Sequence, residues 1–442
     1  MTYNVENLIV GRDWSGLKDC LLRMESPDAA DLLERLGPEN ALLVFRLLPP
    51  EQAGDVFSEL ESHAREDLIL KMTDTRARAV ILELPPDERT ELFEDLPSFL
   101  VRKLVRLLPD EDRKESLELL GYPEDSVGRL MTPDYVALRP GWTVEEAFGH
   151  LRRFGSDAET LNVVYVTDDS GRLIDDIPIR RLILADPEEQ VESLMDRTFI
   201  SIEATADQEE AVKLMERYDL VALPVVDGEG NLLGIVTIDD ALDVVREELT
   251  EDYEKRAAIA PLRLNYANAS PGLLYRKRIG WLLLLGLAGF LSAGVISFFE
   301  DTLARWISLA FFIPILIDSG GNTGSQSATL IVRALALGDL TLEKWWAVVK
   351  KELRVGLFLG GALGGLIALS GLFWPGGNSL GIIVGISMFF IVNWANLVGS
   401  LLPLLLFRLR LDPAVISSPL ITTLVDASGL LIYFSIARLF LG

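Results

Sequence analysis

The sequence predicts a multidomain membrane protein with an α-helical superhelix of short repeats, an α/β pair of related modules and an all-α transmembrane domain of five helices. Three observations predict this fold class. A period of twelve residues runs through 24–123, a strand-and-helix pattern occurs twice in 128–246, and long apolar runs are confined to 271–442. The expected domains are therefore 1–127, 128–246 and 271–442, with an acidic connecting helix at 247–270.

Charge is divided along the same boundaries. The whole chain of 442 residues has a formal net charge of −25. Residues 271–442 carry +4 and residues 1–270 carry −29. A soluble half this acidic repels nucleic acid and attracts cations, so we expect no nucleic-acid partner. The chain has one cysteine, Cys20, which excludes an intrachain disulfide. The first residues lack the pattern of a signal peptide, so we expect the soluble half to lie in the cytoplasm.

The first domain is predicted to be a stack of short helices. An apolar marker recurs every twelve residues from Met24 to Leu120, and a proline or an acidic residue often follows it. Both residue types favour the first turn of a helix. A fixed period of this kind predicts a superhelix in which each unit packs on its neighbours. The repeat contains no evident catalytic residue.

Residues 128–246 contain one module twice. Leu130-Met131-Thr132-Pro133 is echoed by Leu194-Met195-Asp196, and Gly171-Arg172-Leu173 is echoed by Gly230-Asn231-Leu232. The repeated pattern resembles a tandem pair of CBS (cystathionine β-synthase) domains. That resemblance covers both copies and implies a regulatory α/β unit.

In the CBS family, Gly-x-x-Thr/Ser-x-x-Asp often holds a ribose and phosphates, and Gly234, Thr237 and Asp240 match this motif in the second copy. The alternative is that Thr237 and Asp240 cap the start of a helix. The first copy has Asp175 in place of the glycine and Arg181 in place of the aspartate. These differences weigh against ATP as a ligand.

The connecting segment 247–270 begins with a dense run of acids. On a helix, Glu248 shares one face with Glu251 and Asp252, and like charges at this spacing destabilise a helix unless a cation intervenes. Hard oxygen ligands suit Mg²⁺ or Ca²⁺. The segment is therefore either a divalent-ion sensor or a solvated face.

Five apolar spans follow, at about 279–299, 305–333, 355–374, 380–407 and 414–439. Basic residues flank these spans mainly on the side of the soluble domains. They are Arg276, Lys277, Arg278, Lys344, Lys350, Lys351, Arg354, Arg408 and Arg410. The expected topology is a multi-pass protein of the cell membrane with cytoplasmic N-terminal domains and the C-terminus outside.

The fifth span contains a lone carboxylate, Asp426. An aspartate at the bilayer centre costs about 2.5–3.5 kcal/mol on insertion scales and usually faces an ion path or a polar partner. Pro419 lacks an N–H group, so a carbonyl near Val415 is expected to lose its helical partner and to face the same cavity. We interpret Asp426 as part of a cation path, the alternative being a buried hydrogen bond to a neighbouring helix.

The second span contains Gly320-Gly321-Asn322-Thr323-Gly324-Ser325-Gln326-Ser327. Its glycines permit either close helix packing or a local break. Packing alone explains Asn322 and Gln326 poorly, which favours a pore lining.

Together, the acidic repeat, the CBS pair, the acidic connector and the membrane motifs at 320–330, 395–403 and 419–429 resemble the MgtE family of magnesium channels. The resemblance implies a homodimer whose pore is lined by the second and fifth spans. It places the pore aspartate on Asp426, with the Thr422 carbonyl as a second contributor. Asn322, from the pattern of the second span, is a further pore-lining candidate. It also implies regulatory magnesium ligands at Asp87, Glu91, Asp240, Glu248, Glu251 and Asp252.

The expected function is Mg²⁺ transport into the cytoplasm, closed by cytosolic Mg²⁺. Two aspartates brought together by a two-fold axis favour an intervening divalent ion, and Mg²⁺ keeps several of its waters. The alternative is a CBS-regulated transporter of Co²⁺, Ni²⁺ or a small solute. We expect no enzyme activity, because the two histidines, His63 and His150, lie outside the spans.

Overall fold

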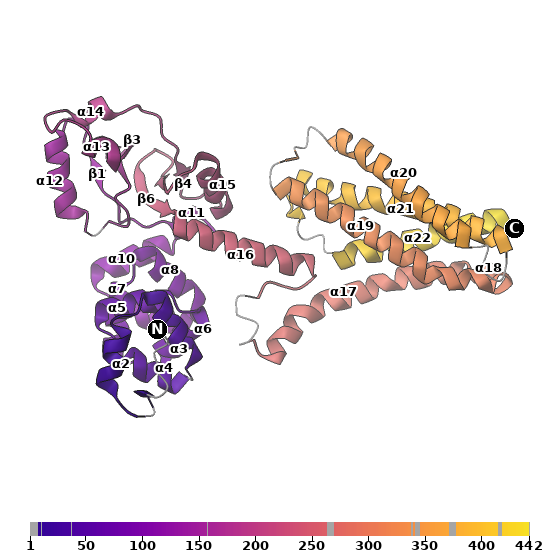
Figure 1. The fold of residues 1–442 in the computed structure, drawn as a ribbon, viewed down its shortest axis with the longest axis horizontal. Coiled ribbons are helices and arrows are strands. Elements are labelled where there is room, and N and C mark those ends of the chain that lie inside the picture. Colours follow the sequence, from indigo (N-terminus) through magenta and orange to yellow (C-terminus); the bar gives the residue numbers. More distant parts are fainter. Residues whose placement is uncertain are drawn as a thin grey trace. The chain divides into compact units, whose positions relative to one another are not determined.

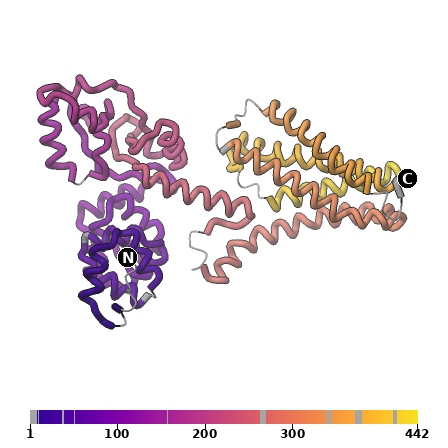
Figure 2. The backbone as a smooth tube through the Cα atoms, in the orientation of Figure 1, coloured from indigo at the N-terminus to yellow at the C-terminus, as the bar shows by residue number. Residues whose placement is uncertain are grey.

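The computed structural model describes residues 8–9, 11–36, 38–156, 158–262, 269–336, 339–340, 345–370, 377–413 and 418–441. The chain forms two compact units, Met1–Glu247 and Glu248–Gly442, each of which is described by itself. Figure 1 labels most of the helices and strands, and Figure 2 follows the backbone from the N-terminus to the C-terminus.

The helical domain confirms the period of twelve. From α3 to α10, successive helices begin at residues 26, 38, 50, 62, 74, 86, 98 and 110. Proline stands in the first turn of several of them, where its missing N–H needs no partner. The helices are α2 (Trp14–Leu21), α3 (Ser26–Arg35), α4 (Pro38–Phe45), α5 (Pro50–Ser58), α6 (Ser62–Lys71), α7 (Asp74–Glu83), α8 (Pro86–Asp95), α9 (Ser98–Val105) and α10 (Asp110–Leu119).

The predicted apolar markers contribute to the core of this stack, as the nearly fully buried Leu60 and Leu84 show. Val44, Val56 and Val80, which stand eight residues after a marker, are fully buried. These positions belong to one continuous hydrophobic cluster that runs through the helices. Each short helix is therefore stabilised by its neighbours along the stack, as expected for a repeat scaffold.

The next part of the first unit contains two three-stranded sheets of the same topology. In each sheet the middle strand pairs parallel with the first strand and antiparallel with the third. The two copies thus have the strand-and-helix repeat that the sequence predicts. The elements are α11 (Val127–Leu130), β1 (Ala137–Leu138), α12 (Val144–Phe154), β2 (Val163–Thr167), β3 (Leu173–Pro178), α13 (Ile179–Ile183), α14 (Val191–Leu194), β4 (Ile202–Glu203), α15 (Gln208–Tyr218), β5 (Ala222–Val226), β6 (Leu232–Thr237) and α16 (Ile238–Arg256).

Asp175, the residue that replaces glycine in the first copy, has a structural role. Its side chain is fully buried on β3 and accepts hydrogen bonds from the backbone N–H groups of Asp196 at 2.8 Å, Arg197 at 3.0 Å and Asp176 at 3.0 Å. It therefore ties the start of the second copy to the sheet of the first copy.

We predict that Asp175→Ala lowers the stability of the first unit by about 2–4 kcal/mol, because buried N–H groups lose a charged acceptor. Asp176→Asn is the matched control. Burial, followed by the charges of Asp175 and Asp196, raises the pKa of Asp176 to about 6, so its charged form is disfavoured in the fold. The midpoint of thermal unfolding should fall for the first variant and stay equal or rise for the second. Equal midpoints for Asp175→Ala and the wild type would refute this role.

The second unit is helical. Its elements are α17 (Pro271–Phe298), α18 (Glu300–Arg305), the 3-10 helix η1 (Ile307–Phe312), α19 (Ile313–Ala336), α20 (Trp345–Ser370), α21 (Gly377–Arg408) and α22 (Ser418–Leu441). By length and hydropathy, four helices of the described chain are able to span a membrane: α17, α20, α21 from Ser379, and α22. The other predicted span is α19, which is long enough to cross a bilayer but carries more polar residues.

Candidate functional site

The polar residues of α19 lie on one exposed face. Asp318, Asn322, Gln326 and Thr329 are exposed, and Ser325 is half-buried between them. Spacings of three and four residues place these side chains on the same side of a helix. Polar side chains exposed on a membrane helix require water, ions or another protein surface, since lipid offers them no partner. This face of α19 is the first element of the candidate ion path.

The glycines of α19 serve packing, and the helix runs through them without a break. A side-chain carbon added at Gly321 would lie 2.9 Å from the methyl group of Thr422, and one at Gly324 would lie 2.9 Å from Ile421. Both neighbours belong to α22. Of the two alternatives left open by the sequence, close packing is therefore the one observed, and it brings Thr422 beside the polar segment that contains Asn322.

Asp426 lies on α22, one turn after Thr422. Its side chain is partly buried, and its Oδ1 atom is buried without a hydrogen-bond donor among the described residues. The predicted alternative, a hydrogen bond to a neighbouring helix, is thus not observed for this oxygen. A carboxylate oxygen left without a donor inside an apolar unit is suited to accept a bond from a cation or its water shell.

The start of the fifth span lies partly outside the described residues. The described helix α22 begins at Ser418, so Pro419 stands in its first described turn, and residues 414–417 are not described. The freed carbonyl near Val415 therefore remains a prediction. The Pro419 carbonyl oxygen accepts hydrogen bonds from the hydroxyls of Thr422 at 2.9 Å and Thr423 at 2.8 Å.

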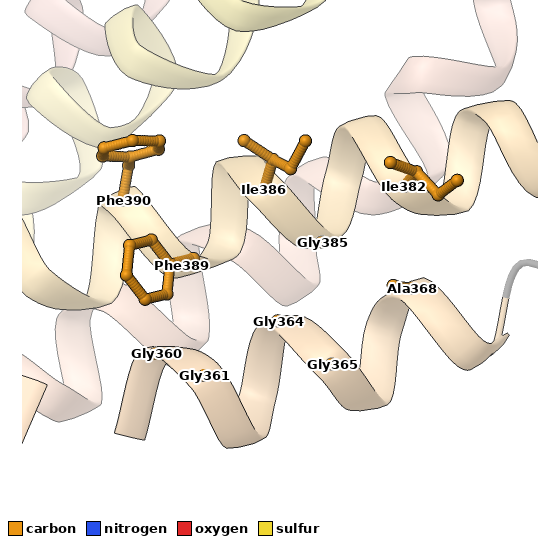
Figure 3. Close-up of a pocket in the computed structure, with 10 residues that line it drawn as sticks. All are labelled: Gly360, Gly361, Gly364, Gly365, Ala368, Ile382, Gly385, Ile386, Phe389 and Phe390. Carbon is orange, nitrogen blue, oxygen red and sulfur yellow. The ribbon is translucent and has the colours of Figure 1, made fainter. Parts of the chain in front are cut away.

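A groove between α20 and α21 is a poor candidate for an ion path. It has a volume of about 360 Å³, and glycines of α20 form one wall opposite Ile382, Ile386, Phe389 and Phe390 of α21. Figure 3 shows Phe389 pointing toward α20. The side chains that line it are all apolar, so it offers a cation no side-chain ligand.

In the first unit, the predicted regulatory residues Asp87 and Asp240 are brought close together. Asp87 on α8 is 8% exposed, and its Oδ1 atom has no hydrogen-bond donor in the described chain. Burial, followed by the charges of Asp240 and Glu159, raises the pKa of Asp87 well above its usual value. A helix of the repeat domain and the start of α16 thus place like charges against each other.

The neighbours of this pair are acidic too. Burial, followed by the charge of Glu91, raises the pKa of Glu88 to about 7, against an opposing effect of Arg65. Burial and the charge of Asp239 raise the pKa of Asp240 to about 6, even though Thr237 donates a hydrogen bond to it at 2.5 Å. We call Asp87, Glu88, Glu159 and Asp240 the acidic face.

Three of the other predicted regulatory residues form ion pairs with basic residues: Glu91 with a residue of the neighbouring helix α6, and Glu251 and Asp252 with residues of their own helix α16. Glu91 accepts a hydrogen bond from Arg65 at 3.1 Å. Glu251 pairs with Lys255 at 2.9 Å, and Asp252 pairs with Arg256 at 3.1 Å. Basic residues one turn later thus compensate the charges of Glu251 and Asp252, and a divalent-ion sensor and a solvated face both stay predictions for this segment. Glu248 lies on the same helix, α16.

Thr237 and Asp240 follow the capping alternative. The Asp240 carboxylate accepts from both the hydroxyl and the backbone N–H of Thr237, at 2.5 Å and 3.3 Å. Across the described residues, no group of three or more His, Cys, Asp or Glu side chains is arranged to hold a metal ion. Glu88 and Glu159 were not singled out from the sequence, because nothing in the local pattern distinguishes them from the many other acids.

These elements define a membrane transport protein with an acidic N-terminal half, and three family matches agree with that class. Residues 313–436 match the MgtE family, described as "Divalent cation transporter"; residues 24–125 match "MgtE intracellular N domain"; and residues 127–188 and 191–247 match "CBS domain".

The chain is 44% identical over 432 residues to the magnesium transporter MgtE of Thermus thermophilus, covering 97% of this chain and 96% of the relative. It is 41% identical over 323 residues to the magnesium transporter MgtE of Bacillus subtilis, covering 73% and 71%. The chain belongs to the MgtE family. It is therefore a membrane transporter with a cytosolic N-terminal domain.

Solved structures resemble the first unit. The crystal structure of the cytosolic domain of the Mg²⁺ channel MgtE in complex with ATP has a TM-score of 0.53 at 37% identity, covering 54% of this chain and 98% of that one. The soluble part of a magnesium transporter has a TM-score of 0.52 at 27% identity, covering 55% and 96%. These likenesses agree with the predicted repeat domain and CBS pair.

Proposed function

We propose that the chain is a Mg²⁺ channel in which two copies form a pore about a two-fold axis. The proposal rests on α19, whose polar face is exposed and whose glycines pack on α22. Helix α22 bears Asp426, and one buried oxygen of this carboxylate has no donor among the described residues. One carboxylate does not balance a divalent ion, whereas two copies supply two. Thr422 and Asn322 flank this position and complete the proposed pore lining.

The proposed cargo is hydrated Mg²⁺. Carboxylate, amide and hydroxyl oxygens are hard ligands, and Mg²⁺ usually keeps several waters while one or two carboxylates hold it. The spans contain no histidine or cysteine, which disfavours zinc and copper. The names of the relatives support the same ion.

Regulation is proposed to act through charge. Cytosolic Mg²⁺ binding at the acidic face would neutralise Asp87 and Asp240 and favour a compact state, and the connector acids Glu248, Glu251 and Asp252 would extend this response toward the pore. A ligand shifts such an equilibrium only by binding one state better than the other. In the compact state the buried carboxylates of Asp87 and Asp240 would repel each other, and a bound cation would relieve that repulsion. In an opened state they would be apart, so the cation would bind the compact state better.

ATP is expected to be absent from the first copy of the CBS pair. Arg181, which stands where the second copy has Asp240, is held by the Leu194 carbonyl oxygen at 2.9 Å and by Asp196 at 3.2 Å. Asp175 is occupied by three backbone N–H groups. We predict that millimolar ATP leaves the midpoint of thermal unfolding unchanged in Mg²⁺-free buffer. A shift that Thr237→Val removes would instead place a nucleotide on the second copy.

The topology is proposed to place the C-terminus outside the cell. Basic residues at the starts of α17 and α20 and at the end of α21 would then face the cytosol with the soluble unit. A cysteine added after Gly442 should react with an impermeant thiol reagent on intact cells. A cysteine at an exposed site such as Asp28 should not.

Uptake into liposomes that contain the purified chain tests the proposed function. Fluorescent indicators or isotopes would compare Mg²⁺ with Ca²⁺, Co²⁺, Ni²⁺ and chloride. We expect Mg²⁺ uptake above that of protein-free liposomes and no chloride uptake. Faster uptake of Co²⁺ or Ni²⁺ than of Mg²⁺ would favour the broader divalent transporter, and chloride uptake would contradict the proposed pore.

A further inference from the structure

Glu352 is a buried acid in the membrane unit that the proposed ion path does not use. It lies on α20 and is 9% exposed, and in the described chain no lysine or arginine forms an ion pair with it. A carboxylate removed from water without a basic partner is costly, so its surroundings must supply hydrogen-bond donors.

Two other helices supply those donors. The Asn396 amide of α21 donates to the Glu352 side chain at 3.0 Å and to its backbone carbonyl oxygen at 2.7 Å. The Ser327 hydroxyl of α19 lies 3.3 Å from the same carboxylate oxygen and 3.1 Å from the Asn396 carbonyl oxygen. Ser327 and Asn396 are each only 3% exposed. These bonds join α19, α20 and α21 at one buried point.

Helices α19 and α21 approach each other closely beside these hydrogen bonds. A side-chain carbon at Gly399 of α21 would lie 2.2 Å from the carbonyl oxygen of Gly324, so the two backbones touch there through glycines. Glycine surfaces allow close approach but offer few side-chain ridges to set the register, and Ile391 of α21 packs on Gly320 of α19 as one of the few that do. The hydrogen bonds of Glu352 add a directional restraint on how far α19 slides and turns against α21.

We propose that Glu352 is a positioning residue which, through Ser327 and Asn396, holds α19 at the height and rotation that aim its polar face into the ion path. The inference rests on the proposed pore. A slip of one residue would move α19 by about 1.5 Å and turn it by about 100°. Asn322 and Ser325 would then leave the pore wall.

The chemistry of the contact predicts which substitutions preserve it. Glu352 acts as a hydrogen-bond acceptor, and glutamine offers an acceptor oxygen at the same distance from the backbone. Glu352→Gln should therefore retain the wild-type behaviour, whereas Glu352→Leu should not. Ser327→Ala removes one of the donors. Ser387→Ala is its control, because Ser387 is also fully buried in the membrane unit but donates only to Ile383 of its own helix.

The test measures uptake into liposomes per correctly folded protein, over a range of Mg²⁺ concentrations and with Ca²⁺ as a competitor. For Glu352→Leu and Ser327→Ala we expect the half-saturating Mg²⁺ concentration or the Mg²⁺ over Ca²⁺ preference to change by about three- to fifteenfold. Glu352→Gln and Ser387→Ala should match the wild type. A purely structural role would lower the yield of folded protein and leave both ratios unchanged.

Two results would overturn the inference. Wild-type ratios in Glu352→Leu would show that the contact does not position the pore, and equal damage by Glu352→Gln and Glu352→Leu would show that charge matters instead of the hydrogen bonds. Failure of the proposed pore would give a different result from failure of this inference. If the pore is wrong, Asp426→Asn will still transport Mg²⁺, whatever the Glu352 variants do.

Discussion

Replacing Asp426 with asparagine is expected to reduce Mg²⁺ uptake into liposomes to the level of protein-free vesicles. Asparagine keeps the size of the side chain but removes its charge. With neither copy contributing a carboxylate, the proposed pore would hold a divalent ion by neutral oxygens alone, inside a unit whose other residues are mainly apolar. Mg²⁺ would then have no compensation for leaving bulk water.

The same variant separates a functional aspartate from a structural one. The charged side chain costs about 2.5–3.5 kcal/mol near the bilayer centre, and one of its oxygens has no donor in the described chain, so Asp426→Asn should leave stability equal or higher. Asp169→Asn is the control, since Asp169 is an exposed aspartate of the CBS pair. It should leave uptake unchanged.

One outcome would contradict the assignment of Asp426 to the pore. If Asp426→Asn lowers the midpoint of thermal unfolding and keeps wild-type uptake per folded protein, then Asp426 is a packing residue and the pore lies elsewhere. Uptake measured with a Mg²⁺ indicator, together with thermal unfolding of the same preparations, distinguishes the two cases.

Some features of this fold could be predicted because their signals are local. Each repeat helix starts where a proline, serine or aspartate follows an apolar marker, so a period of twelve in the sequence became helix starts at the same period. Asp426 stood out for a similar reason. A lone carboxylate in an apolar run is visible without knowing what it faces.

The ends of the membrane helices were harder to place. The predicted third span began at residue 355, whereas α20 begins at Trp345, and α17 begins at Pro271 instead of 279. Basic residues end an apolar run, but they do not end a helix. As a result Glu352 was left outside the span, although it is buried against α19 and α21.

Partners distant in sequence could not be predicted at all. Nothing near Asp87 indicates that Asp240 and Glu159 lie close to it, and nothing near Asp175 points to the backbone N–H groups of Asp196 and Arg197. Such contacts depend on how the elements pack. The resemblance to a known family supplied Asp87 and Asp240 as candidates, and the fold supplied their proximity.

The proximity of Asp87 and Asp240 predicts that Mg²⁺ protects the connecting segment from proteolysis. Trypsin cleavage of the wild-type chain between residues 240 and 270 should be slower in millimolar Mg²⁺ than in EDTA. In the variant with both Asp87→Asn and Asp240→Asn, cleavage should be slow in both conditions. Removing two like charges that repel each other would do permanently what a bound cation is proposed to do reversibly.

The matched control carries the same change in net charge at two exposed sites. Asp28 lies on α3 and Asp169 lies between β2 and β3, and both are exposed. The variant with Asp28→Asn and Asp169→Asn should keep the full response to Mg²⁺. A loss of the response in this control would mean that overall charge governs cleavage, and not the acidic face.

Acid should imitate Mg²⁺, and the direction follows from the raised pKa values. Glu88 near 7 and Asp240 near 6 bind protons more tightly in the fold than in the unfolded chain, so stability falls as pH rises from about 4 to above 7. Between pH 8 and pH 6, cleavage in EDTA should therefore slow and the added effect of Mg²⁺ should shrink. A Mg²⁺ effect of equal size at both pH values would show that these carboxylates do not bind the regulatory ion, because protons and Mg²⁺ would compete for the same oxygens if they did.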